Sequence, residues 1–533
     1  MATQVFVDDV TDELPAPLAL SPRDLVGLAE ELAAYHAHFA PLFRRREQRA
    51  WAAVYLRGLL TADVPRKNVE AMALRLLGAG PGADRRVRAL QQFIGEGAWD
   101  DDRLPAAHRR LVDETLGEDD GVLIIDGSDI PKRGTHSAGV ARQWCGATGK
   151  TDNCQAGVYL GYASRRGYTL LDRRLYLPKD WFTPEYRDRW HACAIPATTT
   201  FRTKSQLAAA MVAAARQAGD LRARWLACDE WYGRDPVFLD QVAASGLWYL
   251  AEVASDTRVW PLVEPATSAP RARPRCWVPP RAPSGKGRRR SRARLHPDSP
   301  PPLRVDALAA QLPPAAWHRY RILEGSKGPL VADFAAVRAV AMRDGLPGPE
   351  VWVLLRRPLT EVPEAAEVKS YLCNAPAATP LEALVRVSGM RWPIECCFEE
   401  GKGELGLDHY ELRFWHGWHH HMTLVILAHH FLVRLQRRLG PREGGHTTPA
   451  RQRRARRGRA HADGLPRPAG GVGHGDADPA AAPEPGGGAP AAARRPAAAG
   501  PRRGRGAGAA AVPAAAQGRR LPLPPQTHTA PPR

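Results

Sequence analysis

Two short apolar runs in this chain each end at an aspartate. Val122 to Ile125 is followed by Asp126, and Trp225 to Cys228 is followed by Asp229. Runs of consecutive apolar residues without polar alternation predict strands that are buried on both faces. An α/β fold of this kind would bring the two carboxylates to neighbouring positions if the two strands are adjacent in the sheet.

The segment from Gly121 to about Val253 alternates between strand and helix patterns. Strands are predicted at 122–125, 156–162, 168–177, 224–228 and 247–253, and helices at 205–218 and 236–245. Three consecutive strands followed by alternating helices and strands is the element order of an RNase H-like core. We therefore predict that residues 111–257 form the first part of an RNase H-like catalytic core, a mixed sheet flanked by helices.

Residues 1–110 are expected to form a helical N-terminal domain. Ser21 and Pro22 suit the start of a helix, and Leu28, Leu32 and Tyr35 recur at helical spacing after them. Arg and Lys residues lie between the apolar positions of the later helical patterns. This domain either contacts DNA or serves in packing or dimerisation, because basic solvent faces are common on helices.

Two inserted segments separate Asp229 from the last part of the core. Residues 271–294 contain ten Arg or Lys and no acid, so residues 258–304 are expected to be a disordered basic insert rich in Pro and Arg. Residues 305–385 contain strand patterns and are predicted to be a β-rich insertion region. Helical patterns at 393–406 and 417–439 then complete the core within residues 386–440.

The last part of the chain, residues 441–533, consists mainly of Ala, Gly, Pro and Arg. It contains 16 Arg and five acidic residues, a net charge of +11 within the +19 of the whole chain. A segment with so few large apolar residues cannot bury a core, so it is predicted to be disordered. Because the composition changes abruptly after a well-patterned helix, the tail is either a DNA-binding arm or the product of a shifted reading frame.

The composition favours a soluble protein that binds a polyanion. A formal net charge of +19 favours nucleic acid, because binding to phosphates releases counterions. The N-terminus lacks the pattern of a signal peptide, and the apolar run from Met422 to Leu432 is too short to cross a membrane. The eight cysteines contain no Cys-x-x-Cys pair, which fits a reducing cytoplasm.

A third acid stands out in the predicted helix that starts at Pro393. Glu395 falls in its first turn, Lys402 lies two turns later on the same face, and Arg391 precedes the helix. With Asp126 and Asp229, Glu395 would create a strongly negative site that divalent cations neutralise, while the two basic residues hold phosphates. Two-metal phosphoryl transfer on nucleic acid needs such a site. The alternative is ordinary: strand-end aspartates are often turn residues, and helices often form surface ion pairs.

These residues and their surroundings resemble the bacterial insertion-sequence transposases of the DDE superfamily. Arg391, Glu395 and Lys402 follow the spacing of the Tyr-Arg-Glu-Lys signature of that family, although Ser388 occupies the Tyr position. The other similar segments are 126–129, 131–134, 139–143, 153–158, 229–233 and 402–408.

The resemblance implies an RNase H-like catalytic domain that is interrupted by a β-rich insert before Glu395. Asp126, Asp229 and Glu395 would bind two Mg²⁺ ions, for which Mn²⁺ could substitute. Water would first cleave DNA at the end of the element, and the freed 3′-OH would then attack target DNA. The residues expected to contact DNA are Arg391, Lys402, Lys132, Arg133 and Trp392.

The implied partners are double-stranded DNA, as terminal inverted repeats and as target, and a second copy of the chain on that DNA. The expected location is the bacterial cytoplasm, near the nucleoid. Trp392 either stacks on an unpaired base or packs in the core. Two other functions stay open: an RNase H-like nuclease that hydrolyses without joining, and a catalytically decayed remnant that only binds DNA.

Other acids and histidines near these motifs have competing roles. Glu399 or Glu400 could replace Glu395 as a metal ligand only if the helix were rotated, and Asp129 and Glu230 match the spacing less well than their neighbours. A zinc site is not expected, because no Cys or acid spacing supports one. The histidines expected to face solvent or phosphate are His416, His419, His420 and His421.

Overall fold

The computed structural model describes residues 22–267, 269–278, 292–322, 330–359 and 367–439. Contacts divide the chain into a unit of residues 1–460 and a second unit of residues 461–533, and all described residues belong to the first. The prediction for the tail at 441–533 therefore falls outside the described residues.

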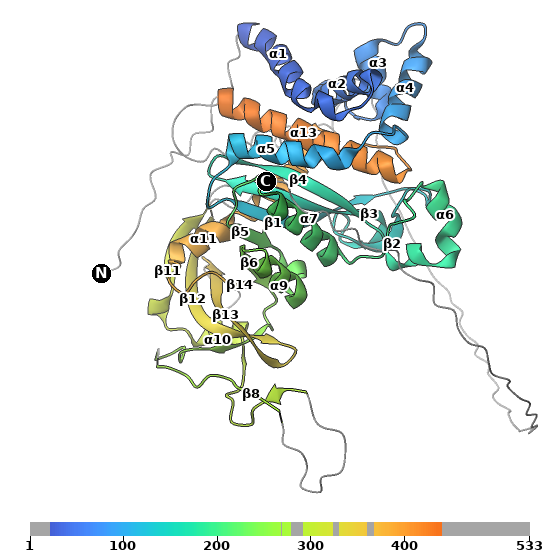
Figure 1. Cartoon of the computed structure of the whole chain (residues 1–533). Helices are drawn as coiled ribbons and strands as arrows, with labels where there is room; N and C mark the ends of the chain where they lie inside the picture. The colour runs from blue at the N-terminus through green and yellow to red at the C-terminus, as the bar shows by residue number, and fades with distance from the viewer. Residues whose placement is uncertain (1–21, 268, 279–291, 323–329, 360–366, 440–533) are drawn as a thin grey trace, which may run out of the picture. The chain divides into compact units, whose positions relative to one another are not determined.

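The predicted helices of the N-terminal region, the core and the C-terminal part are all present (Figure 1). Their starts follow local chemistry. For example, Thr203 and Gln206 form a reciprocal capping box at the start of α7, and Asn68 caps α3 through the backbone N–H of Ala71. The helices are α1 Pro22–Phe39, α2 Arg46–Leu60, α3 Val69–Leu77, α4 Ala83–Gly95, α5 Leu104–Leu116, α6 Arg187–Ala192, α7 Lys204–Ala218, α8 Glu230–Gly233, α9 Pro236–Ala244, α10 Val305–Gln311, α11 Leu381–Gly389, α12 Pro393–Glu404 and α13 Trp415–Leu439.

Most of the strands belong to one large mixed sheet. They are β1 Val122–Pro131, β2 Ala141–Cys145, β3 Lys150–Ser164, β4 Gly167–Tyr176, β5 Trp225–Cys228, β6 Trp248–Val253, β7 Arg258–Pro261, β10 Leu303–Arg304, β11 His318–Ile322, β12 Leu330–Arg343, β13 Leu346–Pro358 and β14 Lys369–Cys373, while β8 Cys276–Trp277 and β9 Arg294–Leu295 form a separate pair.

The strand order confirms the predicted RNase H-like core. Strands β4, β3 and β1 are antiparallel neighbours, and β1, β5 and β6 follow as parallel neighbours. The predicted β-rich insert extends this same sheet, because β14 pairs with β6 and β13 pairs with β14. The insert is therefore continuous with the edge of the catalytic sheet.

Helices cover both faces of the core sheet, which explains the continuous apolar runs. In β1, Val122 and Ile124 pack in one cluster with α12 and α13, whereas Leu123 and Ile125 pack in a second cluster with α7 and α9. All four side chains are buried. Successive residues of a strand point to opposite faces, so a strand between two helical layers needs apolar residues at every position.

The N-terminal helices pack on α13, which comes from the other end of the described chain (Figure 1). The hydroxyl of Tyr35 in α1 donates a hydrogen bond to the carbonyl of Leu427 over 2.9 Å, and the hydroxyl of Tyr55 in α2 lies 2.8 Å from Nδ1 of His421. Helix α13 in turn packs against β4. The predicted helical domain at 1–110 and the catalytic core therefore share one continuous hydrophobic core.

The expectation that the α13 histidines face solvent or phosphate is wrong for three of the four. His419, His420 and His421 are buried, and only His416 is exposed. The reason is that α13 is covered by β4 on one side and by α2, α4 and α5 on others. The buried rings bind the protein instead: Nδ1 of His420 lies 2.9 Å from the carbonyl oxygen of Ile94.

Two buried histidines make stability depend on pH. Burial lowers the pKa of His421 to about 3 and that of His108 to about 4. Both values lie below the unfolded value of about 6.5. The unfolded chain therefore takes up protons first as the pH falls, so stability that is complete above pH 6.5 is lost toward pH 3 to 4.

We expect the free energy of unfolding to fall by about 2 kcal/mol per buried histidine between pH 7 and pH 5. Urea unfolding at the two pH values measures this difference. The variant His421→Gln should lower stability at pH 7 but show a smaller loss on acidification, whereas His416→Gln should behave like the parent. An unchanged pH dependence in His421→Gln would contradict the assignment.

The segment predicted to be a disordered basic insert is partly ordered. Its ends form β7 and β10, which pair with each other at the edge of the sheet, and it supplies the β8–β9 pair. Arg271 forms an ion pair with Glu264 at 3.3 Å, and Arg273 forms one with Glu350. Acids elsewhere in the chain thus neutralise part of the basic run. The centre of the insert, residues 279–291, lies outside the described residues.

Of the helices in the described ranges, none combines the length and the apolar character that crossing a bilayer requires.

Candidate active site

Three adjacent parallel strands bring acidic residues to the same level of the sheet. Ile125 of β1 pairs with Cys228 of β5, which pairs with Ala251 of β6. The next residue in each strand direction is an acid, namely Asp126, Asp229 and Glu252. The two predicted aspartates therefore meet at one edge, as expected from the apolar runs, and a third carboxylate joins them.

Asp126 lies inside β1, where its carboxylate is largely buried. Its Oδ1 accepts a hydrogen bond of 2.7 Å from the backbone N–H of Gly127. Burial raises the pKa of the Asp126 carboxyl to about 7, and the negative charges of Asp229 and Glu395 add to this rise, whereas Arg391 opposes it. Asp126 and Glu395 both pair with Arg391, and Asp229 follows the neighbouring strand β5 at the level of Asp126.

Asp229 follows β5 and is the N-cap of the short helix α8. Its Oδ1 accepts a hydrogen bond of 3.3 Å from the backbone N–H of Tyr232. Burial raises the pKa of the Asp229 carboxyl, while this hydrogen bond and the charge of Arg391 oppose the rise. Asp229 thus has the cap role expected of an ordinary strand-end aspartate, and it also faces the shared acidic site.

Glu395 reaches the site from the first turn of α12, as predicted. Pro393 occupies the first helical position. The next residue, Ile394, is buried in the hydrophobic core and so anchors the start of the helix. The Glu395 side chain is one-third exposed, so it lies at the mouth of the site. A helix start fixes its direction more firmly than a loop would.

Arg391 lies among the carboxylates. Its guanidinium nitrogens are 3.6 Å from Oδ2 of Asp126, 3.9 Å from Oε2 of Glu252 and 2.7 Å from Oε1 of Glu395. Only 14% of its side chain is exposed. In this structure, Arg391 therefore neutralises part of the negative charge of the acidic site. The role predicted from the sequence was contact with a DNA phosphate.

The other predicted DNA contacts differ in their exposure to solvent. Arg133 is exposed, and Lys402 and Trp392 are half-buried at the end and the start of α12. Lys132 is held inside the protein: its Nζ donates to the carbonyl of Tyr410 over 3.2 Å and lies 3.4 Å from the centre of the Tyr410 ring. Burial lowers the pKa of Lys132 to about 8. These contacts give Lys132 a structural role between β1 and the segment after α12.

The competing acids have other partners. Asp129 accepts a hydrogen bond of 2.8 Å from the backbone N–H of Gly146 and lies 3.9 Å from Nζ of Lys204. Glu230 pairs with Arg234 on the surface. Glu400 binds the Tyr168 hydroxyl at 2.7 Å and the His429 ring at 2.8 Å. Glu399 is exposed.

Glu252 is the acidic residue at the site that the sequence reasoning missed. It also pairs with Lys369 of β14 at 3.0 Å. In the sequence, Glu252 is the single acid within the otherwise apolar strand 248–253. It follows Ala251, the residue that pairs with Cys228 of β5. An acid inside a strand that is buried on both faces needs a partner, and here Arg391 and Lys369 provide it.

Gly233 allows α8 to approach β6 closely beside Asp229 and Glu252. A Cβ at this position would lie 1.9 Å from the carbonyl oxygen of Glu252. We expect Gly233→Ala to lower the free energy of unfolding by about 1–3 kcal/mol and to reduce activity, because α8 must move away from the sheet. Urea unfolding and a DNA cleavage assay measure the two effects.

The matched control is Gly403→Ala in α12, where an added Cβ meets no atom within 4 Å. That change should raise stability by about 0.5–1 kcal/mol, because glycine is unfavourable inside a helix. Equal effects of the two substitutions would contradict the close approach of α8 to β6.

The donor set suits a hard divalent cation such as Mg²⁺, which prefers carboxylate oxygens and retains water. The Tyr232 hydroxyl is buried and has no hydrogen-bond partner among the described residues. No three His, Cys, Asp or Glu side chains within the described ranges are close enough to hold a metal as they stand. Instead, Arg391 lies between the carboxylates and supplies the positive charge.

Comparison with known proteins identifies the family of the chain. The chain matches a family described as DDE superfamily endonuclease over residues 38–329, a range that includes Asp126 and Asp229 and ends before Glu395. No curated protein matches the chain. Because the family match covers more than half of the 533 residues, the chain belongs to the DDE superfamily endonuclease family.

Proposed function

We propose that this protein is the transposase of a bacterial insertion sequence, which cleaves DNA at the ends of the element and joins them to target DNA. The observation that supports this function best is that Asp126 of β1 and Glu395 of α12 both pair with the Arg391 guanidinium, while Asp229 follows the strand β5 that lies beside β1 in register. Carboxylates fixed by strands and a helix start are what two-metal phosphoryl transfer requires.

Asp126, Asp229 and Glu395 would hold two Mg²⁺ ions, with Mn²⁺ as a substitute. When bound, the ions would activate the attacking oxygen and stabilise the leaving oxygen of the phosphodiester. Asp229 is held by its hydrogen bond from the backbone N–H of Tyr232, and Asp126 by its hydrogen bond from the backbone N–H of Gly127. Glu252 would keep Arg391 oriented toward the site rather than act as a ligand, because Lys369 already neutralises it.

Arg391 has two roles in this proposal. Without DNA, its guanidinium offsets the repulsion among the acids, as its contacts with Asp126 and Glu395 indicate. With DNA, the same planar donor group would hold a phosphate oxygen beside the scissile bond. Lys402, seven residues after Glu395, lies about 10 Å further along the axis of α12 and would hold a more distant phosphate.

Joining separates this function from hydrolysis alone. The full-length protein is incubated with Mg²⁺, a labelled duplex taken from the DNA that flanks its gene, and a supercoiled target plasmid. The proposal expects labelled strands joined to the plasmid through a free 3′-OH, by a homodimer that pairs two ends. Cleavage without joined product would favour a nuclease, and binding without cleavage would favour a decayed remnant.

A further inference from the structure

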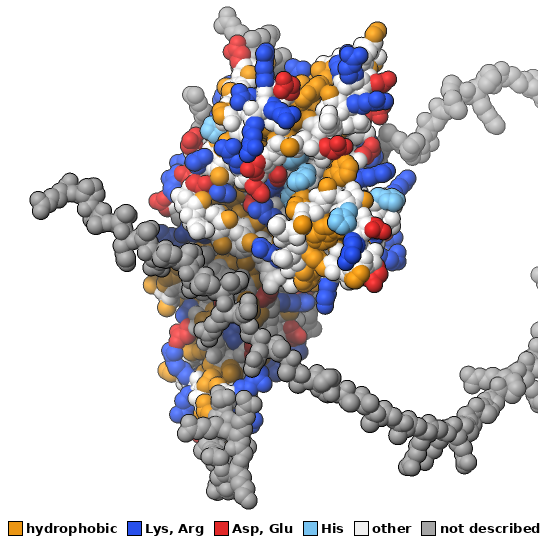
Figure 2. Space-filling model, turned by 45° about the vertical axis from the view of Figure 1, so that its right-hand side comes forward, with side chains coloured by type: hydrophobic (Ala, Val, Ile, Leu, Met, Phe, Trp, Pro, Cys, Tyr) orange, Lys and Arg blue, Asp and Glu red, His pale blue; other side chains and the backbone are white. Residues whose placement is uncertain are grey.

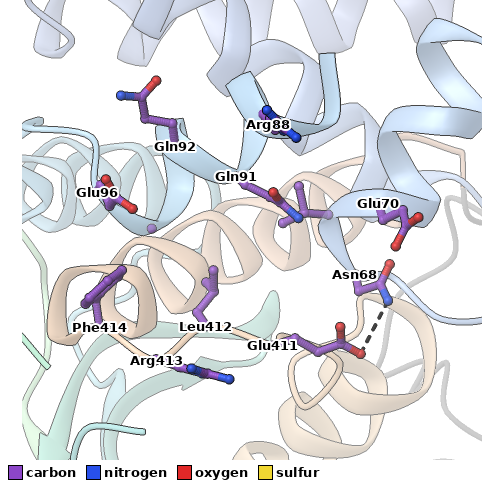
Figure 3. Close-up of a pocket in the computed structure, with 12 residues that line it drawn as sticks. Asn68, Glu70, Arg88, Gln91, Gln92, Glu96, Glu411, Leu412, Arg413 and Phe414 are labelled. Carbon is purple, nitrogen blue, oxygen red and sulfur yellow. Dashed lines mark hydrogen bonds between the residues drawn. The ribbon is translucent and has the colours of Figure 1, made fainter. Parts of the chain in front are cut away.

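A cavity lies between α4 and the segment 411–414, and none of the three predicted metal ligands lines it (Figure 3). Its volume is about 510 Å³. Arg88, Gln91 and Gln92 of α4 form one wall, and Leu412, Arg413 and Phe414 form the other. The segment 411–414 follows the helix that contains Glu395, so the cavity is connected to the active site through α12.

The exposed side chains of α4 are of the kinds that bind base edges. Arg85, Arg88, Gln91 and Gln92 are exposed, whereas Leu90, Phe93 and Ile94 are buried. Arg donates to the acceptors of guanine, and the amide of Gln both donates to and accepts from adenine. Neither arginine forms an ion pair with an acid in the part of the chain that the structure describes. The polar face of α4 is therefore free to bind a ligand.

The charges around the cavity favour base edges over phosphates. Glu70, Glu96 and Glu411 lie at its margin, and Glu411 is neutralised by Arg66 at 3.1 Å. Carboxylates repel phosphate oxygens but accept hydrogen bonds from the amino groups of cytosine and adenine. On the face shown in Figure 2, Lys and Arg side chains are interspersed with Asp and Glu side chains. Binding there depends on individual side chains rather than on a uniformly basic surface.

The arrangement of α3 and α4 also suits duplex DNA. The two helices contact each other and are joined by the short turn 78–82, which contains three glycines. A pair of helices joined by a short glycine-containing turn is a frequent way to present a second helix to the major groove. The second helix here is α4, with its Arg and Gln side chains exposed.

We infer that α4 reads base edges in the major groove of duplex DNA through Arg88, Gln91 and Gln92. This inference rests on the proposed function, since it specifies how that site finds its substrate. Helix α4 packs on α13, which in turn packs against β4 of the core sheet.

Base preference can be measured separately from cleavage. The full-length protein binds a pool of duplexes with randomised base pairs in the presence of a chelator, so that nothing is cut, and the bound fraction is sequenced. Gln91→Ala and Gln92→Ala should each lose about tenfold discrimination at one or two base positions, with unchanged affinity for non-specific duplex. The matched control is Gln217→Ala, an exposed glutamine of α7, which should keep the parent preference.

Several results would overturn the inference. The first is that the parent protein shows no base preference, and the second is that the α4 variants keep the preference of the parent. The third is that the protein binds single strands and that α4 substitutions weaken this binding while duplex binding is unchanged. The last result would assign the cavity to an unpaired base. Cleavage by a protein whose α4 variants keep the parent preference would refute this inference alone. Altered preference in a protein that never cleaves would refute the proposed function alone.

Discussion

Asp126→Asn should abolish metal-dependent DNA cleavage while leaving the protein folded. The substitution replaces a carboxylate that is buried beside Asp229 by a neutral amide of the same shape. Losing one anionic ligand removes about 4 kcal/mol of transition-state stabilisation, which corresponds to roughly a thousandfold slower cleavage. Thermal stability should be equal or higher, because the repulsion between the two aspartates disappears. Initial rates of plasmid nicking and a thermal melt measure both.

The control is Glu230→Gln, which changes an acid next to Asp229 in the chain. Glu230 is exposed and pairs with Arg234. Its removal should leave the cleavage rate near that of the parent. If Asp126→Asn cleaved DNA at the parent rate, Asp126 would not be a metal ligand. If both variants lost activity equally, the effect would come from the net charge of the site rather than from ligation.

The largest effect on stability is expected for Arg173→Met. Arg173 lies in β4, and its side chain is fully buried. Its guanidinium contacts Asp101, lies 3.1 Å from Asp172, and donates to the carbonyl of His419 over 3.4 Å. It thereby connects the sheet with α13 and with the segment before α5. Methionine fills much of the volume but leaves two acids without this partner, so unfolding should become easier by about 3–5 kcal/mol.

Urea unfolding at neutral pH measures this loss. The control is Arg165→Met, because Arg165 is half-exposed and pairs with Asp120 at the surface over 3.1 Å. Exposed ion pairs contribute about 1 kcal/mol or less. Equal losses in the two variants would show that the buried network at Arg173 does not connect the helices to the sheet as described.

The sequence was sufficient to predict the centre of the fold, because its signals are local. Continuous apolar runs indicated the strands that end near Asp126 and Asp229, and the position of Pro393 indicated the start of the helix with Glu395. Strand β1 nevertheless continues to Pro131, well beyond the apolar run. It does so because β3 pairs with it as far as Cys154. Backbone pairing with a distant strand extends a strand through polar residues that carry no strand pattern.

The features that the sequence did not reveal depend on contacts between distant segments. Strand β14 pairs with β6 only because the insert folds back to the sheet. His419, His420 and His421 are buried because β4 and helices from the N-terminal region cover α13, and no local pattern indicates that cover. Glu252 could be recognised as part of the site only once the register of β5 and β6 was known. The ion pairs of Arg391 with three acids likewise join segments that are far apart in the sequence.

The central claim is that Asp126, Asp229 and Glu395 together bind the metal ions that cleave DNA. The most direct measurement is a crystal structure of the full-length protein with DNA and Mn²⁺, in which anomalous scattering locates the ions. The account predicts two anomalous peaks that contact these three carboxylates, with Arg391 on a phosphate. Peaks bound elsewhere, or a Glu395 carboxylate that contacts no ion while Arg391 still lies among the acids, would contradict it.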